Sequence, residues 1–194
     1  MASDGPLDAA GRVIEVLEGL GIPYMVVGSV ACSVHGIPRA TMDVDIVAGI
    51  RNEHVAPFVE ALQGDFHVDR DMICEAILHR SSFNVIHLGT LFKTGVFVPL
   101  DDNVSRTEMA RRRRHLILEG SDARWYVASP EDTILRKMHW FREGGELSDR
   151  QWQDILGIFQ VQRERLRLRY LRDAARLLGV SDLVERALDE AELA

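Results

Sequence analysis

The pattern of apolar and polar positions separates the chain into a mixed first part and an all-helical last part. Before residue 128, short apolar runs that predict strands alternate with stretches of helical spacing. Helices are expected at 7–20, 30–35, 54–63 and 71–78, and strands at 24–27, 41–47, 82–87, 93–98 and 123–128. This mixture predicts an α/β or α+β sheet domain over residues 1–128, in which 82–87 and 93–98 form a hairpin.

The last part of the chain carries helix-start signals and no strand signal. Ser129 precedes a proline and has an acid three residues later, which is typical of an N-cap, and helical periodicity follows to residue 141. Ser148 with Gln151 forms a second capping box, and an apolar stripe at 168–178 precedes a final helix from 181. Residues 129–194 are therefore expected to form an all-helical C-terminal extension.

Composition narrows the class of protein but does not name a function. The chain has 194 residues, of which 46% are hydrophobic, so it is long enough for a buried core. No apolar stretch is long enough to span a membrane, so we expect a cytoplasmic protein without a membrane partner. Cys32 and Cys74 lie in apolar contexts without the spacing of a metal or redox motif, which favours free buried thiols.

A formal net charge of −7 argues against a general electrostatic attraction to nucleic acid. It leaves room for a local basic patch, and the four arginines Arg111 to Arg114, with Arg106 upstream, form one candidate. Their composition fits both a solvated face and a contact to phosphate or RNA. The sequence does not separate these two interpretations.

Two acidic residues alternate with apolar ones on the strand predicted at 41–47. Asp43 and Asp45 are two positions apart, so both side chains project from one face of that strand. Like charges this close repel each other unless a cation or several hydrogen-bond donors offset them. Mg²⁺, or Mn²⁺ in its place, is a cation that oxygen ligands of this kind bind.

A second motif precedes this strand and suits a phosphate group. Gly28 and Ser29 lie between the apolar strand 24–27 and the short helix 30–35, where backbone N–H groups and a hydroxyl meet an anion favourably. Together with the two carboxylates, they form a coherent pair for binding a nucleoside triphosphate through a divalent metal. Ordinary alternatives exist for each motif, namely a simple strand-to-helix turn and the solvated face of an edge strand.

These motifs resemble the signature of the nucleotidyltransferase superfamily: Gly with Gly or Ser, a spacer, then Asp-x-Asp flanked by apolar residues. The run Arg39-Ala40-Thr41-Met42-Asp43-Val44-Asp45 is similar, more specifically, to the minimal bacterial AbiEii-type toxins. The run from Ser129 to Lys137 resembles a helix of the same proteins whose lysine follows an acidic start. The resemblance implies an α+β fold, with a mixed β-sheet flanked by helices and the helical extension at the C-terminus.

The resemblance also implies roles for individual residues. Asp43 and Asp45 would be the catalytic metal ligands, and the nucleotide would be bound by Gly28, Ser29, Arg39, Thr41, Lys93 and Lys137. The implied activity is Mg²⁺-dependent transfer of a nucleotidyl group from an NTP to a hydroxyl of tRNA or protein. An AbiEii-type toxin would also have a cognate antitoxin as a partner. Arg39 as a surface ion-pair partner and Lys137 as a solvated helix residue are the ordinary alternatives.

The chain departs from the family at one position. Gly95 stands where the family's Lys-x-Asp strand, here beginning at Lys93, carries a third carboxylate. Candidates to replace that acid are Asp101, Asp102 and Glu131, and two side chains of the preceding strand, His87 and Asn84, are candidates to approach the site. A strand histidine more often has a structural role. The departure opens a second interpretation, a catalytically degenerate member of the fold that binds a nucleotide or a partner.

Overall fold

The computed structural model describes residues 5–117 and 124–192, and these residues form two compact units. The first unit runs to Val30 and resumes from Ala40 to Val127. The second unit combines Ala31–Arg39 with the chain from Ala128 onward. Each unit is described by itself below.

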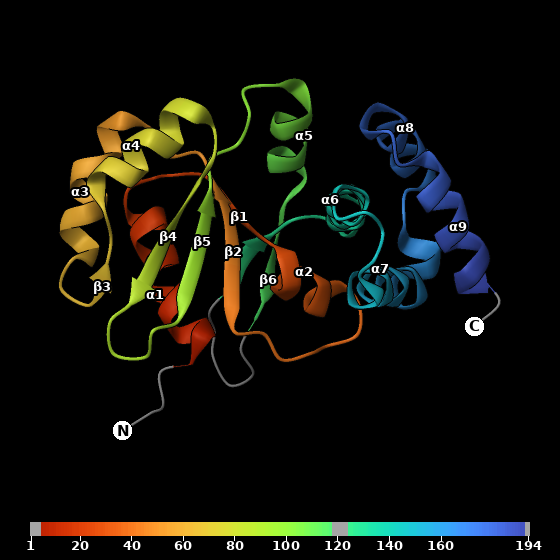
Figure 1. Ribbon diagram of the computed structural model, residues 1–194, viewed down its shortest axis with the longest axis horizontal. Coiled ribbons are helices and arrows are strands. Elements are labelled where there is room, and N and C mark those ends of the chain that lie inside the picture. Colours follow the sequence, from red (N-terminus) through yellow and green to blue (C-terminus); the bar gives the residue numbers. More distant parts are fainter. Residues whose placement is uncertain (1–4, 118–123, 193–194) are drawn as a thin grey trace. The chain divides into compact units, whose positions relative to one another are not determined.

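The first unit is built on a mixed sheet whose strand order is β3-β4-β5-β2-β1-β7-β6 (Figure 1). β2 runs parallel to β5, and β1 runs parallel to β7, whereas the other neighbouring pairs are antiparallel. This mixed sheet with flanking helices confirms the predicted α+β fold. The strands are β1 (Tyr24–Val27), β2 (Asp43–Ala48), β3 (Phe66–His67), β4 (Ser82–His87), β5 (Lys93–Phe97), β6 (Arg113–Leu116) and β7 (Arg124–Val127).

Helices pack against this sheet and against each other. α1 contacts β2 and β5, α4 contacts β4, and α3 lies between them through contacts with α1 and α4. The central strands are apolar on the buried face: Val44 and Ile46 of β2 are 1% and 0% exposed. The helices of this unit are α1 (Pro6–Gly19), α3 (Asn52–Leu62), α4 (Arg70–His79) and α5 (Asn103–Arg111), with the first residues of α2 (Gly28–His35).

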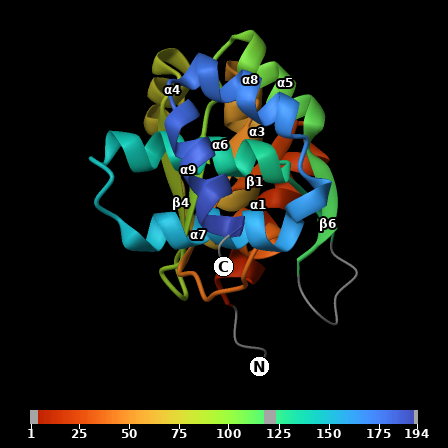
Figure 2. The same cartoon turned by 90° about the vertical axis from the view of Figure 1, so that its right-hand side faces the viewer.

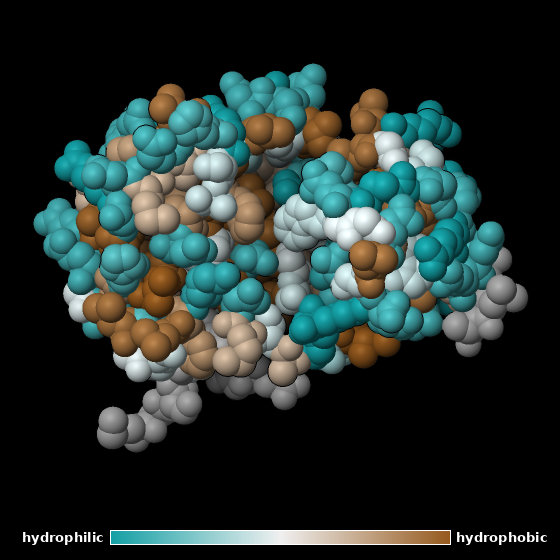
Figure 3. All heavy atoms as spheres, in the orientation of Figure 1, coloured by the Kyte–Doolittle hydropathy of each residue, from teal (hydrophilic) through white to brown (hydrophobic). Residues whose placement is uncertain are grey.

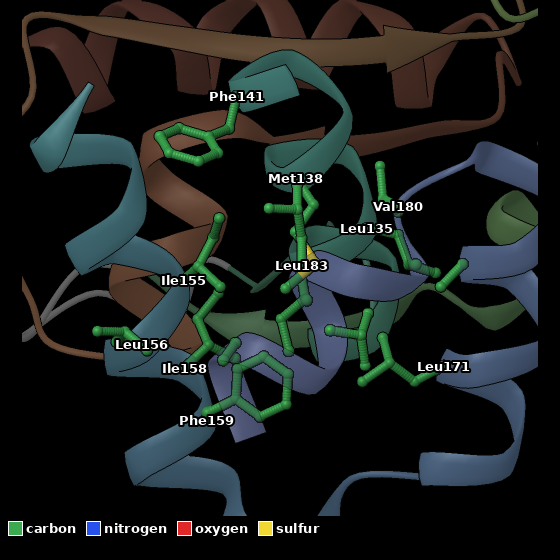
Figure 4. Close-up of a cluster of buried hydrophobic side chains, with 14 of the residues drawn as sticks. Leu135, Met138, Phe141, Ile155, Leu156, Ile158, Phe159, Leu171, Val180 and Leu183 are labelled. Atoms are coloured by element: carbon green, nitrogen blue, oxygen red, sulfur yellow. The ribbon is translucent and has the colours of Figure 1, made fainter. Parts of the chain in front are cut away.

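The second unit is helical, and Figure 2 turns its helices toward the viewer. Its apolar core draws side chains from several of them: Leu135, Met138, Ile155 and Leu183 are among those that point toward one another in Figure 4. Cys32 brings the C-terminal part of α2 into the same core. The helices are α6 (Pro130–Glu143), α7 (Asp149–Gln162), the 3₁₀ turn η1 (Arg163–Arg165), α8 (Leu168–Leu178) and α9 (Ser181–Glu192).

Most elements predicted from the sequence are present, with ends that differ by a few residues. The two predicted caps are confirmed: Ser129 accepts a hydrogen bond from the Asp132 N–H, and Ser148 accepts one from the Gln151 N–H. The predicted strand at 123–128 appears as β7, although residue 123 lies outside the described part of the chain.

Three elements have no clear signal in the sequence, namely β3, α5 and β6. α5 lacks an apolar stripe and begins instead at an N-cap, where Asp102 accepts a hydrogen bond from the Ser105 N–H at 2.7 Å. β6 consists largely of basic residues because it is an edge strand, paired only with β7. The arginine run thus ends α5 and forms the start of β6, and Arg114 pairs with Glu18.

The surface carries both polar and apolar residues. On the face shown in Figure 3, hydrophilic residues prevail and apolar residues form scattered patches. Among the described residues, no helix is both long and apolar enough to cross a membrane. Cys32 and Cys74 are both free, as expected, although only Cys32 is fully buried.

Gly36, at the end of α2, allows the close approach of α7 in the second unit. A Cβ at Gly36 would lie 2.9 Å from the Ile158 nitrogen and 3.0 Å from the Gly157 carbonyl carbon. Both are backbone atoms, which have little freedom to yield. We therefore expect Gly36→Ala to lower the free energy of unfolding by about 2 kcal/mol, measured by urea denaturation.

Gly19→Ala is the matched control for this prediction. Gly19 is the last residue of α1, and a Cβ there would meet nothing within 4 Å. Alanine favours helix more than glycine does, so stability should be unchanged or slightly raised. Equal effects of the two substitutions would contradict the packing role assigned to Gly36.

Candidate active site

The two predicted metal ligands lie together on one face of β2. Val44 and Ile46 are buried on the opposite face, whereas Asp43 and Asp45 are only half-buried. Asp45 pairs with Val27 on β1 and with Gly95 on β5, and Asp43 pairs with Lys93. The carboxylates therefore project beside the end of β1, where Gly28 and Ser29 begin α2.

The Asp45 carboxylate lies between two glycines. A Cβ at Gly28 would be 2.5 Å from Oδ2 of Asp45, and a Cβ at Gly95 would be 2.9 Å from Oδ1. Gly28 also has a φ of +63°, a left-handed conformation that side chains rarely adopt. Gly28 is thus needed twice, for the turn from β1 into α2 and for the room that Asp45 occupies.

Ser29 is the second residue of α2 and belongs to its first turn. The first N–H groups of a helix have no partner within the helix, and they carry the positive end of its dipole. The Gly28-Ser29 pair at the start of α2 therefore follows directly on the β1 residue that pairs with Asp45. This arrangement suits a phosphate bridged by a metal to the acids.

Two further predicted residues contact or face Asp43. The Thr41 hydroxyl lies 3.1 Å from Oδ1 of Asp43 and 3.0 Å from its carbonyl oxygen, and it donates a hydrogen bond there. Lys93 is exposed on the neighbouring strand, directly beside Asp43 in the register. Thr41 therefore orients a carboxylate, and Lys93 places a positive charge on the same sheet face.

Arg39 and Lys137 lie in the second unit and share one acidic partner, Asp154 of α7. Arg39 donates two hydrogen bonds to the Asp154 carboxylate, at 2.8 and 2.9 Å, and Lys137 donates one at 2.7 Å. The side chains of Lys137 and Asp154 are each 8% exposed, and that of Arg39 is 23% exposed. These three side chains form an ion-pair cluster in which the Lys137–Asp154 contact is largely buried.

A pocket of about 210 Å³ adjoins this cluster in the second unit. Arg39, Arg150, Asp154 and Cys32 are among its lining residues. Burial alone would raise the pKa of Asp154, but the hydrogen bonds from Arg39 and Lys137 outweigh it, so the pKa lies below its ordinary value. Burial raises the pKa of the Cys32 thiol to about 11, so this cysteine is a neutral packing residue.

The residues present fit a single divalent cation. Mg²⁺ is usually held by one or two carboxylates together with substrate phosphates and water, and Asp43 and Asp45 supply the carboxylates. Because Gly28 and Gly95 have no side chain, the Asp45 carboxylate can lie close to both backbones with one oxygen near each. Across the described ranges, no group of three or more histidine, cysteine or acidic side chains is placed to hold a metal.

The candidates for a third acid have other roles in the structure. Asp101 accepts a hydrogen bond from Arg106 at 2.6 Å, and Asp102 caps α5. Both follow the C-terminal end of β5, whereas Asp43 and Asp45 pair with its first three residues. Glu131, in the second unit, accepts a hydrogen bond from the Arg167 N–H at the start of α8.

His87 has the structural role that strand histidines usually have. Its side chain is 6% exposed, with ring nitrogens 2.8 Å from Arg12 and 2.7 Å from the Thr90 hydroxyl. His87 is three positions after Asn84 on β4, so the two side chains point to opposite faces of the sheet. Asn84 shares its face with the carboxylates, and His87 therefore lies on the other face. Asn84 pairs with Gly95 and lies on the same face as Asp45.

Asp154 is the residue that sequence reasoning missed. One signal was available, since an acid stands among Trp152, Ile155 and Leu156 on a helix whose apolar residues are buried. A buried acid requires a cation, and Arg39 and Lys137 were already singled out. Their convergence on Asp154 depends on the packing of α2, α6 and α7, which the sequence does not display.

Comparison with known proteins supports the fold. No protein-family model matches the sequence, and no curated protein sequence matches it. Among solved structures, the antibiotic-resistance factor ANT(2'')-Ia is similar with a TM-score of 0.57 at 12% identity, covering 91% of this chain and 94% of the other. A nucleotidyltransferase-like antigenic protein from Paracoccidioides brasiliensis is similar with a TM-score of 0.53 at 19% identity, covering 97% and 94%.

These similarities show that the chain has a nucleotidyltransferase-like fold. At these identities they concern the fold and carry no residue-level assignment. The predicted superfamily resemblance is thus supported at the level of architecture, and the roles of individual residues stay predictions.

The Asp154 cluster yields a stability prediction for the second unit. Asp154→Asn removes the carboxylate that contacts the buried Lys137 ammonium and also pairs with Arg39, so the free energy of unfolding should fall by about 3 kcal/mol. The folded-state pKa of Asp154 is lowered, so its contribution is fully present above the unfolded pKa of about 3.9 and is lost as pH falls through the folded pKa. Urea denaturation at several pH values should therefore show the difference between wild type and variant shrinking below about pH 4.

Asp189→Asn, at an exposed acid of α9, is the control and should change stability little. A loss with Asp189→Asn as large as with Asp154→Asn would mean that the cluster has no special role. A difference that stays constant down to the lowest pH would likewise contradict it.

Proposed function

We propose that this protein is a nucleotidyltransferase that moves a nucleotidyl group from an NTP to an acceptor hydroxyl. One observation carries the proposal: Asp45, beside Asp43, projects into a space bounded by Gly28 and Gly95, at the start of α2, in a nucleotidyltransferase-like fold. An ordinary solvated strand face does not require two glycines around one carboxylate. A strand-to-helix turn alone does not require two acids beside it.

The roles follow from the chemistry of each group. The N–H groups at the start of α2 and the Ser29 hydroxyl bind phosphate oxygens, and Lys93 offsets their charge. Asp43, oriented by Thr41, and Asp45 would hold Mg²⁺ or Mn²⁺, which would supply charge neutralisation at the α-phosphate. The acceptor oxygen bonds to the α-phosphorus, the bond to the β-phosphate oxygen breaks, and pyrophosphate and the hydroxyl proton are released.

Arg39 and Lys137 are the remaining predicted nucleotide ligands. Each carries a positive charge of the kind that offsets the charge of a triphosphate, and each is paired with Asp154. The ion pairs also fix both side chains before any nucleotide arrives, which reduces the entropy lost on binding. That either residue contacts the nucleotide stays a prediction.

The acceptor is proposed on separate grounds. The resemblance to AbiEii-type proteins favours tRNA or a protein as acceptor, and a role as the toxin of a toxin–antitoxin pair in the cytoplasm. ANT(2'')-Ia, of similar fold, is known in complex with adenylyl-2''-tobramycin, which adds a small polyhydroxylated molecule to the acceptors worth testing. All three acceptors present a hydroxyl to the same reaction.

The test is transfer of label from each of the four α-labelled NTPs, with Mg²⁺, to total tRNA, cell-extract protein or an aminoglycoside. We expect label on one acceptor class and a decrease of about 100-fold or more in Asp45→Asn, since the variant loses a charge that holds the metal. Asp71→Asn, at an exposed acid in the first turn of α4, should retain the wild-type rate. Label transfer that survives Asp45→Asn unchanged would contradict the proposed site.

A second candidate function is favoured by one observation, the glycine at position 95. A degenerate member of the fold would bind an NTP or a partner without turning it over. Titration calorimetry separates the two functions from a pure interaction protein. We expect NTP binding that requires Mg²⁺ and weakens about tenfold or more in Asp43→Asn.

NTP binding of this kind without label transfer to any acceptor would support the degenerate module. Absence of NTP binding would contradict both candidates. In that case the helical second unit would become the first place to search for a partner.

A further inference from the structure

Three neighbouring strands place Asn84, Gly95 and Asp45 in one row across the sheet. Asn84 of β4 pairs with Gly95 of β5, and Gly95 pairs with Asp45 of β2. Residues directly opposite each other on neighbouring strands point to the same face of the sheet. Asn84 and Asp45 therefore share a face, and the residue between them has no side chain.

The side-chain oxygens of these two residues border the space above Gly95. A Cβ at Gly95 would lie 2.9 Å from Oδ1 of Asp45, 3.4 Å from Cε2 of Phe97 and 3.9 Å from Oδ1 of Asn84, so the Phe97 ring forms the apolar side of this space. Asn84 is exposed, and within residues 5–117 and 124–192 its side-chain amide makes no hydrogen bond. The Asn84 amide is thus available to a ligand that enters this space.

We propose that the Asn84 amide oxygen is the third protein oxygen at the divalent-cation site formed with Asp43 and Asp45. This inference rests on the proposed function. Amide carbonyl oxygens are hard ligands of the kind that Mg²⁺ and Mn²⁺ accept beside carboxylates. Asn84 reaches from β4 toward the place that a side chain at position 95 would take, so the third ligand comes from the neighbouring strand.

The other polar residues of this region do not take the same place. His87 lies on the opposite face of β4, and Ser82, on the same face as Asn84, pairs with Phe97 instead of Gly95. Lys93 is a cation and is no ligand for a metal. The row through Gly95 therefore singles out Asn84.

An amide in place of a carboxylate removes one negative charge from the metal site. The site carries one negative charge fewer than a site with three acids, and cation affinity falls as ligand charge falls. An acid at position 84 should restore the missing charge without crowding Asp45. An acid at position 95 would first require the Asp45 side chain to move, because the new Cβ would stand 2.9 Å from its oxygen.

Mn²⁺ binding to the full-length protein tests this inference without a measurement of activity. Electron paramagnetic resonance of free Mn²⁺ would be recorded with a non-hydrolysable NTP analogue present throughout. We expect Asn84→Ala to weaken Mn²⁺ binding about tenfold, Asn84→Asp to tighten it, and Ser82→Ala to leave it unchanged. Circular dichroism would verify that each variant is folded.

The outcomes separate this inference from the proposed function. Mn²⁺ binding that is lost in Asp45→Asn but unchanged in both Asn84 variants would overturn the role of Asn84 and leave the proposed metal site intact. Mn²⁺ binding that is absent in the wild type would overturn both. Equal losses in Asn84→Ala and Ser82→Ala would also overturn the inference, because the effect would then belong to the strand surface.

Discussion

The site depends on the close approach of the Asp45 carboxylate to two backbone positions that have no side chain. Gly28 and Gly95 lie on opposite sides of it, on the continuation of β1 and on β5, and a Cβ at either would crowd a carboxylate oxygen. Gly28 also makes the left-handed turn that starts α2. Gly95 therefore has two consequences. It carries no carboxylate where the family that the motifs resemble has a third acid, and it leaves room for the Asp45 side chain.

The second unit contains a cluster of charged side chains formed by Arg39, Lys137 and Asp154. Burying Arg39, Lys137 and Asp154 together costs desolvation, which the bidentate arginine and the short lysine contact offset. Buried ion pairs of this kind are weak evidence for stability, because apolar side chains of similar size would often serve the core as well.

The local elements could be predicted because they depend on neighbouring residues. The alternation of Asp43 and Asp45 with Val44 and Ile46 indicates one exposed and one buried face, and Ser129 and Ser148 mark helix starts by their side chains. The contacts that could not be predicted depend on which strands and helices are neighbours in the fold. The pairing of Gly95 with both Asp45 and Asn84, and the convergence of Arg39 and Lys137 on Asp154, arise from topology and packing. For the same reason β6 was missed, since a basic edge strand exists through its partner β7.

A third acid can have two separate tasks in phosphoryl transfer, metal binding and proton transfer, and the proposed site with Asn84 would supply only the first. A carboxylate can hold a metal and can also accept the proton of the attacking hydroxyl. An amide oxygen such as that of Asn84 can hold the metal, but it is not a base at ordinary pH. Under the proposed function, metal and nucleotide binding would not require a third acid, whereas turnover would need a proton acceptor from the substrate, from solvent or from another side chain. An acceptor hydroxyl that is already acidic, or a phosphate that takes the proton itself, would relieve that need. Under the proposed function, the chemistry of the acceptor would therefore decide between an enzyme and a binding module with a glycine at 95.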